Sequence, residues 1–180
     1  MVLVATMLAA AIFGAGDQYL GSLTTLGPWT YQVSLLSAPW LLLAFLAGCC
    51  QREKRRAIAV GLAATLVALG GYMLMTLSPV EHAQLSLTTV TGFVRSDPLI
   101  FVGGVVTGPL FGWLGYRWRT QRAWLGAAVT AALLSLEPVV HYEVGRPVLT
   151  TTVAVSEAVA GLVIAAVFAL LRPRPAPAAL

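Results

Sequence analysis

Three carboxylic acids lie within or at the end of long apolar runs: Asp17, Glu137 and Glu157. An ionisable side chain inside a bilayer is costly, so it is a candidate functional group by default. A carboxyl group in such a place can hold a cation, relay a proton or serve as a general acid. We therefore take these three residues as the candidate site, and as its catalytic residues if the protein is an enzyme.

The three acids are expected at nearly the same depth in the membrane. Glu137 lies fifteen residues after Arg122, and Glu157 lies fifteen residues before Arg172. At the rise of an α-helix each is roughly 22 Å from its basic flank, and Asp17 is about 24 Å from the N-terminus. We expect the acids to converge on one pocket in the outer half of the bilayer, with at least one of them protonated.

Four further side chains are candidates for the lining of this pocket. Tyr72 reaches the depth of the acids, and Trp40 lies in the middle of its own apolar run. His141 follows Glu137 by one helical turn, and Arg95 is a cationic group expected at the outer edge. The simpler interpretation is that each acid pairs with a loop arginine or bonds to backbone at a helix end.

The composition places these residues in a membrane protein. The chain is 58% hydrophobic and only 10% charged, whereas a soluble domain carries about 25% charged residues. Six runs reach the roughly 20 residues that a spanning helix needs. They cover residues 2–20, 31–50, 57–77, 98–116, 123–141 and 149–171. We predict an all-α, polytopic membrane protein with six transmembrane helices in one bundle (1–171) and a disordered Pro/Ala-rich tail (172–180).

The basic residues predict the orientation of these helices. Nine of the eleven follow the second, fourth and sixth runs: Arg52, Lys54, Arg55, Arg56, Arg117, Arg119, Arg122, Arg172 and Arg174. Arg95 and Arg146 alone lie on the opposite side. Since cytoplasmic loops carry the excess of lysine and arginine, both termini are expected in the cytoplasm of a plasma-membrane protein.

The fourth run contains a stripe of glycines, Gly104, Gly108 and Gly112. Glycines spaced by four line one helix face and allow another backbone to approach closely. Tight packing within the bundle is the simpler interpretation. The alternative is a homodimer, or a membrane partner for which this chain is an accessory subunit.

The sequence lacks the usual motifs of several other functions. We find no Gly-rich phosphate loop, no nucleophile–base arrangement and no metal-ligand spacing. Cys49 and Cys50 are adjacent and are interpreted as apolar filler. We therefore expect no cofactor, no metal and no nucleic-acid partner; the expected partners are the lipid bilayer and a small-molecule or lipid ligand.

Short motifs carry a resemblance to a known kind of protein. They are residues 40–48 before a basic loop, Gly70-Gly71-Tyr72, residues 108–112 leading into 115–119, and Glu137-Pro138. With these motifs the chain resembles a family of small uncharacterised integral membrane proteins of high-GC bacteria, which implies no activity. Its size, six spans and inside termini are more loosely similar to the substrate-binding subunits of vitamin-type ABC importers, as an analogy of architecture.

Two functions follow from the acids. The first is binding or transport of a small cationic or polar solute in a carboxylate-lined pocket. The second is an intramembrane enzyme of the cyclase or isomerase type, in which Asp17 or Glu157 protonates a lipid or isoprenoid. Trp40 and Tyr72 would then form aromatic walls that stabilise a carbocation.

Overall fold

The computed structural model describes residues 2–81, 86–96, 98–121, 124–143 and 149–171. Within these ranges the chain is all helical, with eight α-helices, two short 3₁₀ helices and no strand. The α-helices are α1 (Val2–Ser22), α2 (Pro28–Ser34), α3 (Ala38–Cys49), α4 (Lys54–Thr76), α5 (Leu87–Ser96), α6 (Pro98–Gln121), α7 (Trp124–Glu143) and α8 (Thr151–Leu170). The 3₁₀ helices are η1 (Thr24–Leu26) and η2 (Pro79–Glu81).

Several of these helices are long and apolar enough to cross a membrane. Four qualify singly, namely α1, α4, α6 and α8, and α2 with α3 qualifies as a pair that is bent by 46°. The apolar part of α7 is shorter and covers Trp124–Val139. Many leucine and valine side chains of α1, α6 and α8 are exposed, as expected for helices that face lipid. The helices therefore indicate a membrane protein.

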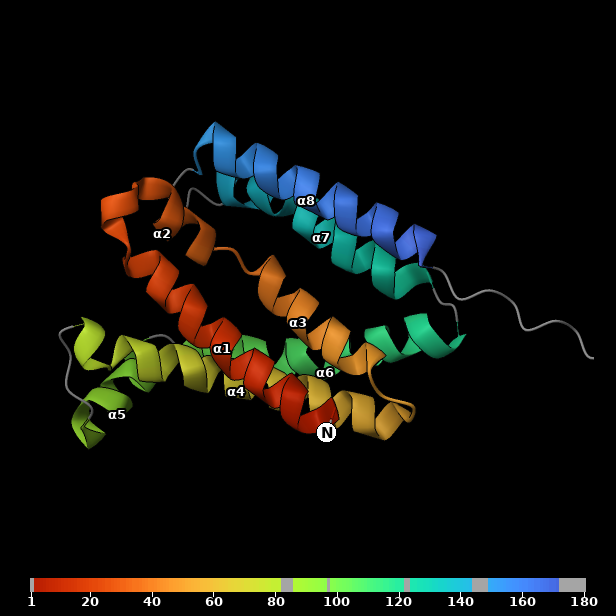
Figure 1. Cartoon of the computed structure of the whole chain (residues 1–180), viewed down its shortest axis with the longest axis horizontal. Coiled ribbons are helices and arrows are strands. Elements are labelled where there is room, and N and C mark those ends of the chain that lie inside the picture. Colours follow the sequence, from red (N-terminus) through yellow and green to blue (C-terminus); the bar gives the residue numbers. More distant parts are fainter. Residues whose placement is uncertain (1, 82–85, 97, 122–123, 144–148, 172–180) are drawn as a thin grey trace, which may run out of the picture.

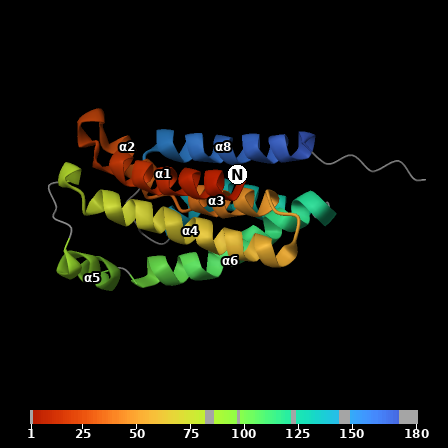
Figure 2. The same cartoon turned by 60° about the horizontal axis from the view of Figure 1, so that its bottom comes forward.

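The helices form a bundle in which α7 and α8 run side by side as a hairpin (Figure 1). On the rest of the bundle, α1 packs on α4, α4 packs on α6, and α3 packs on both α4 and α6. The hairpin attaches to this group through contacts of α7 with α6 and α3. Figure 2 shows α4 and α6 side by side, with α5 at one end of the molecule.

Glycines allow α3, α4 and α6 to approach one another closely. A Cβ added at Gly112 would overlap the carbonyl oxygen of Ala57 in α4, and one at Gly48 in α3 would overlap the carbonyl oxygen of Gly112. A Cβ at Gly108 would lie 2.8 Å from the Thr65 hydroxyl oxygen. The face formed by Gly104, Gly108 and Gly112 is thus filled by α4 of the same chain, which leaves no room on it for another helix.

The expected continuous helix over 31–50 is broken. The amides of Leu35 and Leu36 bond to the carbonyls of Gln32 and Val33, at 3.2 and 3.1 Å, which closes α2 in tight turns. Pro39 then lies in the first turn of α3, where a missing N–H removes no helical hydrogen bond. The prediction of one helix over residues 31–50 was therefore wrong at residues 35–37.

One further helix was not predicted, and two segments named in the sequence analysis lie outside the described residues. The stretch between the third and fourth runs contains α5, a helix that the six runs do not include. The tail over 172–180 and the loop that contains Arg146 lie outside the described residues.

Candidate functional site

Glu137 of α7 bonds to the beginning of α3. Its Oε1 accepts a hydrogen bond from the Ser37 amide at 2.5 Å, and its Oε2 accepts one from the Ala38 amide at 2.8 Å. The Ser37 side chain makes no capping bond of its own. Because the first amides of a helix have no partner within it and carry a partial positive charge, a carboxylate is a favourable cap. Glu137 therefore joins α7 to the break between α2 and α3.

Glu157 of α8 is the most buried of the acids and is only 5% exposed. Neither of its carboxyl oxygens has a hydrogen-bond donor among the residues that the structure describes. The Glu137 carboxyl lies within hydrogen-bonding reach of the Glu157 carboxyl and interacts with it electrostatically. Two adjacent carboxylates repel each other in a buried site. The pair becomes compatible when a proton or another cation lies between them.

Close packing of α7 against α8 brings this pair together. Gly161, one helical turn after Glu157, lies against Ser135 and Ala131 of α7. The Ser135 hydroxyl donates its proton to the Ala131 carbonyl of its own helix at 3.0 Å. It therefore cannot donate the same proton to Glu157. The small residues thus place Glu157 against α7 without supplying it with a donor.

A cavity of about 370 Å³ lies between α2 and α8, and Glu157 forms part of its wall. Apart from Glu157, the wall contains two hydroxyls, one indole and three aliphatic side chains. These residues are Thr152, Ser156, Trp29, Val33, Leu36 and Val153. The indole N–H of Trp29 is already bonded to the Leu26 carbonyl at 2.9 Å. The cavity therefore combines one acid with an apolar and aromatic surface, which suits a small ligand.

Asp17 of α1 belongs to a different cluster. It accepts a hydrogen bond from the Trp40 side chain, and its Oδ2 is buried without a donor among the described residues. The Trp40 ring contacts Phe13 at a centroid distance of 5.2 Å and Tyr72 at 6.0 Å. Asp17 does not line the 370 Å³ cavity. The structure thus brings Asp17, Trp40 and Tyr72 together on one side of α3, and Glu137 and Glu157 beside its first amides.

Of the two remaining candidates, Arg95 and His141, only Arg95 has a described side chain. Arg95 is exposed in the last turn of α5. The side chain of His141 lies outside the described residues. No group of three or more potential metal ligands occurs in the part of the chain that the structure covers.

Sequence reasoning missed three features of the site. The amides of Ser37 and Ala38 carry no side-chain signal, although Ser37 two residues before Pro39 is a pattern typical of a helix start. Thr152 and Ser156 precede Glu157 by five residues and by one, and they were not considered as lining residues. Trp29 lies between the first and second apolar runs, where an aromatic residue is typical of the membrane interface, but it lines the cavity.

Comparison with known proteins gives a family and no activity. No curated protein matches the chain, and no solved structure matches it. A family model described as "Family of unknown function (DUF6518)" matches residues 4–180, which is nearly the whole chain. The chain therefore belongs to this family of unknown function, DUF6518.

Proposed function

We propose that this protein binds a small organic cation at Glu157 and carries it across the plasma membrane. In this proposal α1, the bent pair α2–α3, α4, α6, α7 and α8 form six spans, with both termini in the cytoplasm. The orientation rests on basic residues at one end of the bundle, where α3 and α6 end and α4 begins. They are Arg52 before α4, Lys54, Arg55 and Arg56 in the first turn of α4, and Arg117 and Arg119 near the end of α6. An excess of lysine and arginine is typical of cytoplasmic loops.

The observation that carries the proposal is the buried carboxyl of Glu157, a residue that contributes to the wall of the 370 Å³ cavity. It is 95% buried, has no donor among the described residues and lies beside a second carboxyl. A charged group in such a place needs a counter-charge. The surrounding lining is mostly apolar and includes the Trp29 indole, and aromatic faces attract organic cations. A small ammonium compound therefore matches the cavity better than an anion or a neutral sugar.

A proton and the cation would compete for the same carboxyl pair. When Glu157 is protonated it can donate to Glu137, which keeps its bonds to the Ser37 and Ala38 amides. When a cation binds, the proton has to leave, because the cavity wall offers one acid. Binding should therefore release about one proton and weaken as the pH falls.

The break between α2 and α3 gives this exchange a structural consequence. Discontinuous helices beside a binding site are frequent in transporters, where they let one group of helices move against another. Here Glu137 links that break to α7, and Glu157 acts on Glu137 from α8. A change of charge at Glu157 would alter the strength of the link between α7 and α3.

The test uses the full chain in detergent or nanodiscs, with tetramethylammonium as the probe. We expect the probe to raise the thermal unfolding temperature of the native protein and to release protons in weakly buffered solution. The variant Glu157→Gln should lose both effects, while Glu53→Gln, an exposed acid in the connection before α4, should keep them. Probe binding that is unchanged in Glu157→Gln would rule out Glu157 as the binding group.

A second function is favoured by the cluster around Asp17. Asp17 has one buried carboxyl oxygen and bonds to Trp40, whose ring contacts Phe13 and Tyr72. An acid beside such an aromatic group is suited to protonate an olefin, since aromatic faces stabilise the cation that forms. An intramembrane enzyme acting on an isoprenoid would use this cluster. It predicts that Asp17→Asn abolishes activity on such a lipid, whereas the transport proposal assigns no solute contact to Asp17.

A further inference from the structure

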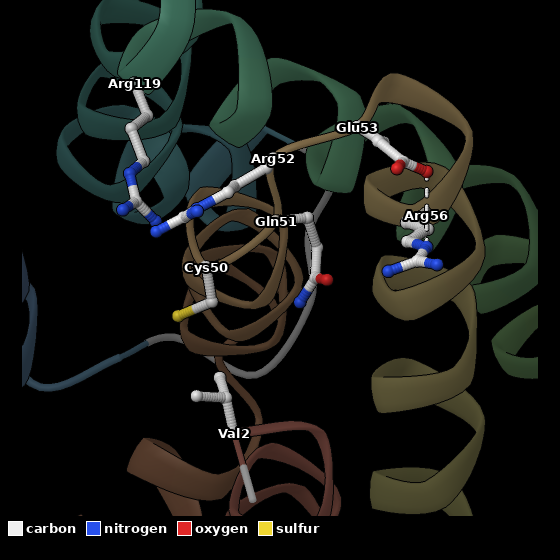
Figure 3. Close-up of a pocket in the computed structure, with 7 residues that line it drawn as sticks. All are labelled: Val2, Cys50, Gln51, Arg52, Glu53, Arg56 and Arg119. Carbon is white, nitrogen blue, oxygen red and sulfur yellow. Dashed lines mark ion pairs between the residues drawn. The ribbon is translucent and has the colours of Figure 1, made fainter.

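A second cavity, of about 580 Å³, lies at the opposite end of α3 from the acids (Figure 3). Its wall combines the beginning of α1, the connection from α3 to α4, the first turn of α4 and the end of α6. The residues that line it are Val2, Cys50, Gln51, Arg52, Glu53, Arg56 and Arg119. This is the cytoplasmic end of the bundle in the orientation proposed above.

The charges of this cavity are mostly positive. Three guanidinium groups face one carboxylate, and the carboxylate of Glu53 is paired with Arg56 at 3.2 Å. Arg119 donates to the Cys49 carbonyl at 2.6 Å, which leaves its other N–H groups available. Arg52 has no hydrogen bond or ion pair with another described residue. The cavity therefore has an excess of two positive charges and several donors that a ligand can use.

The two arginines without an acidic partner extend toward one another in Figure 3. They are Arg52 from the connection and Arg119 from α6. Like charges at close range repel, and an anion between them stabilises both. Planar guanidinium groups are well suited to bind phosphate oxygens in pairs. The beginning of α4, directly after Glu53, adds a helix N-terminus, which also favours negative charge.

The apolar surroundings indicate that the anion is attached to a lipid. Val2 belongs to the cavity wall and is itself 60% exposed. Leu3 and Val4 in the same first turn are also exposed, and further along α1 Leu8 and Ile12 add to this apolar surface, the last of them 71% exposed. Acyl chains can lie on this surface while the headgroup enters the cavity. A free phosphate ion would make no use of it.

We propose that this cavity binds the phosphate of an anionic phospholipid from the cytoplasmic leaflet, with Arg52 and Arg119 as the main contacts. Basic pockets between transmembrane helices are suited to such headgroups, and each arginine near the membrane surface adds about 1 kcal/mol. That free energy corresponds to roughly fivefold in affinity for each arginine. The site is separate from the Glu157 cavity and does not depend on its function.

The test measures lipid binding to the full chain in detergent by native mass spectrometry or thermal stabilisation. Phosphatidylglycerol should bind and stabilise the protein, and zwitterionic phosphatidylcholine should do so much less. Arg52→Gln and Arg119→Gln should each weaken phosphatidylglycerol binding about fivefold. Arg55→Gln is the matched control, because it removes the same charge from the first turn of α4, three residues after Arg52, without lining the cavity.

Each other outcome counts against the proposal. Equal binding of the two lipids would show that charge is not recognised. An equal loss in Arg55→Gln would indicate diffuse attraction rather than a built site. Competition by glycerol phosphate at concentrations similar to the lipid would assign the cavity to a soluble phosphate compound. Because Arg119 also bonds to α3, Arg52→Gln is the decisive variant, and its unfolding temperature without lipid should match the native protein.

Discussion

Two sides of the bundle hold their helices together by different means. On the glycine-packed side, formed by α1, α3, α4 and α6, glycines place one backbone directly on another. On the acid side, formed by α2, α7, α8 and the beginning of α3, the connection from α7 to α3 includes the carboxylate of Glu137. Direct contact between α2 and α8 is sparse, and a cavity lies between them.

This difference shows which side is suited to a change of conformation. Close-packed backbones have little freedom to shift, because any movement loses many contacts at once. A carboxylate that bonds to two amides can release them when its own charge is balanced elsewhere. The glycine-packed side is thus the rigid scaffold, and in the transport proposal the acid side is where binding of a proton or a cation alters the structure.

The largest effect is expected from Gly112→Leu on the glycine-packed side. A side chain there would overlap the Ala57 carbonyl oxygen and crowd Gly61, whose Cα lies 3.0 Å from the added Cβ position. Overpacking of a core against flexible side chains costs about 1–3 kcal/mol; against backbone, we expect at least about 3 kcal/mol. Thermal unfolding in detergent and the yield of monodisperse protein measure the loss.

Gly103→Leu is the control, because it lies on the same helix and a Cβ there meets nothing within 4 Å. It should unfold within a few degrees of the native protein. Equal tolerance of both substitutions would mean that α4 and α6 do not pack as closely as described, and the contrast between the two sides would disappear.

A smaller loss is expected from Glu137→Ala on the acid side. The substitution leaves the amides of Ser37 and Ala38 without their acceptor. Hydrogen bonds to charged groups contribute about 1.5–3 kcal/mol each, and their loss is partly offset where water reaches the amides. We expect the free energy of unfolding to fall by about 2 kcal/mol. Glu137→Gln keeps an acceptor oxygen and should lose about half as much.

The measurement that separates this link from general stability is hydrogen exchange at the beginning of α3. The amides of Ser37 and Ala38 should exchange faster in Glu137→Ala, while those of α4 and α6 keep their protection. Uniform loss of protection across the bundle would mean that the acid side is as firmly integrated as the glycine-packed side.

The long helices could largely be predicted from the apolar runs, but the break between α2 and α3 and the short helix α5 could not. Each of the six runs corresponds to one helix or to the α2–α3 pair, because a long apolar segment has few alternatives to a helix in lipid. The break at residues 35–37 is stabilised by Glu137, which lies a hundred residues away in sequence. No local pattern reports such a bond. The helix α5 was missed because its polar sequence resembles a loop.

For the candidate site, the sequence could identify the acids but not their grouping. Depth along a helix follows from counting residues, and that count put Asp17, Glu137 and Glu157 in one layer. Which helix neighbours which is a tertiary property, and α1 packs on α4 rather than beside α7 and α8. Asp17 therefore lies with Trp40 and Tyr72, and Glu157 lies with Glu137.

The smallest effect is expected from Asp17→Asn, which tests whether the two acid clusters act separately. Asparagine has nearly the same shape and keeps an oxygen that can accept the Trp40 hydrogen bond. The substitution should change the free energy of unfolding by less than about 1 kcal/mol and leave tetramethylammonium binding at Glu157 unaltered. Isothermal calorimetry on the native protein and the variant compares the two affinities directly. A large loss of probe affinity would mean that Asp17 and Glu157 serve one binding site across α3. In that case α1 would belong to the acid side of the bundle and not to the glycine-packed side.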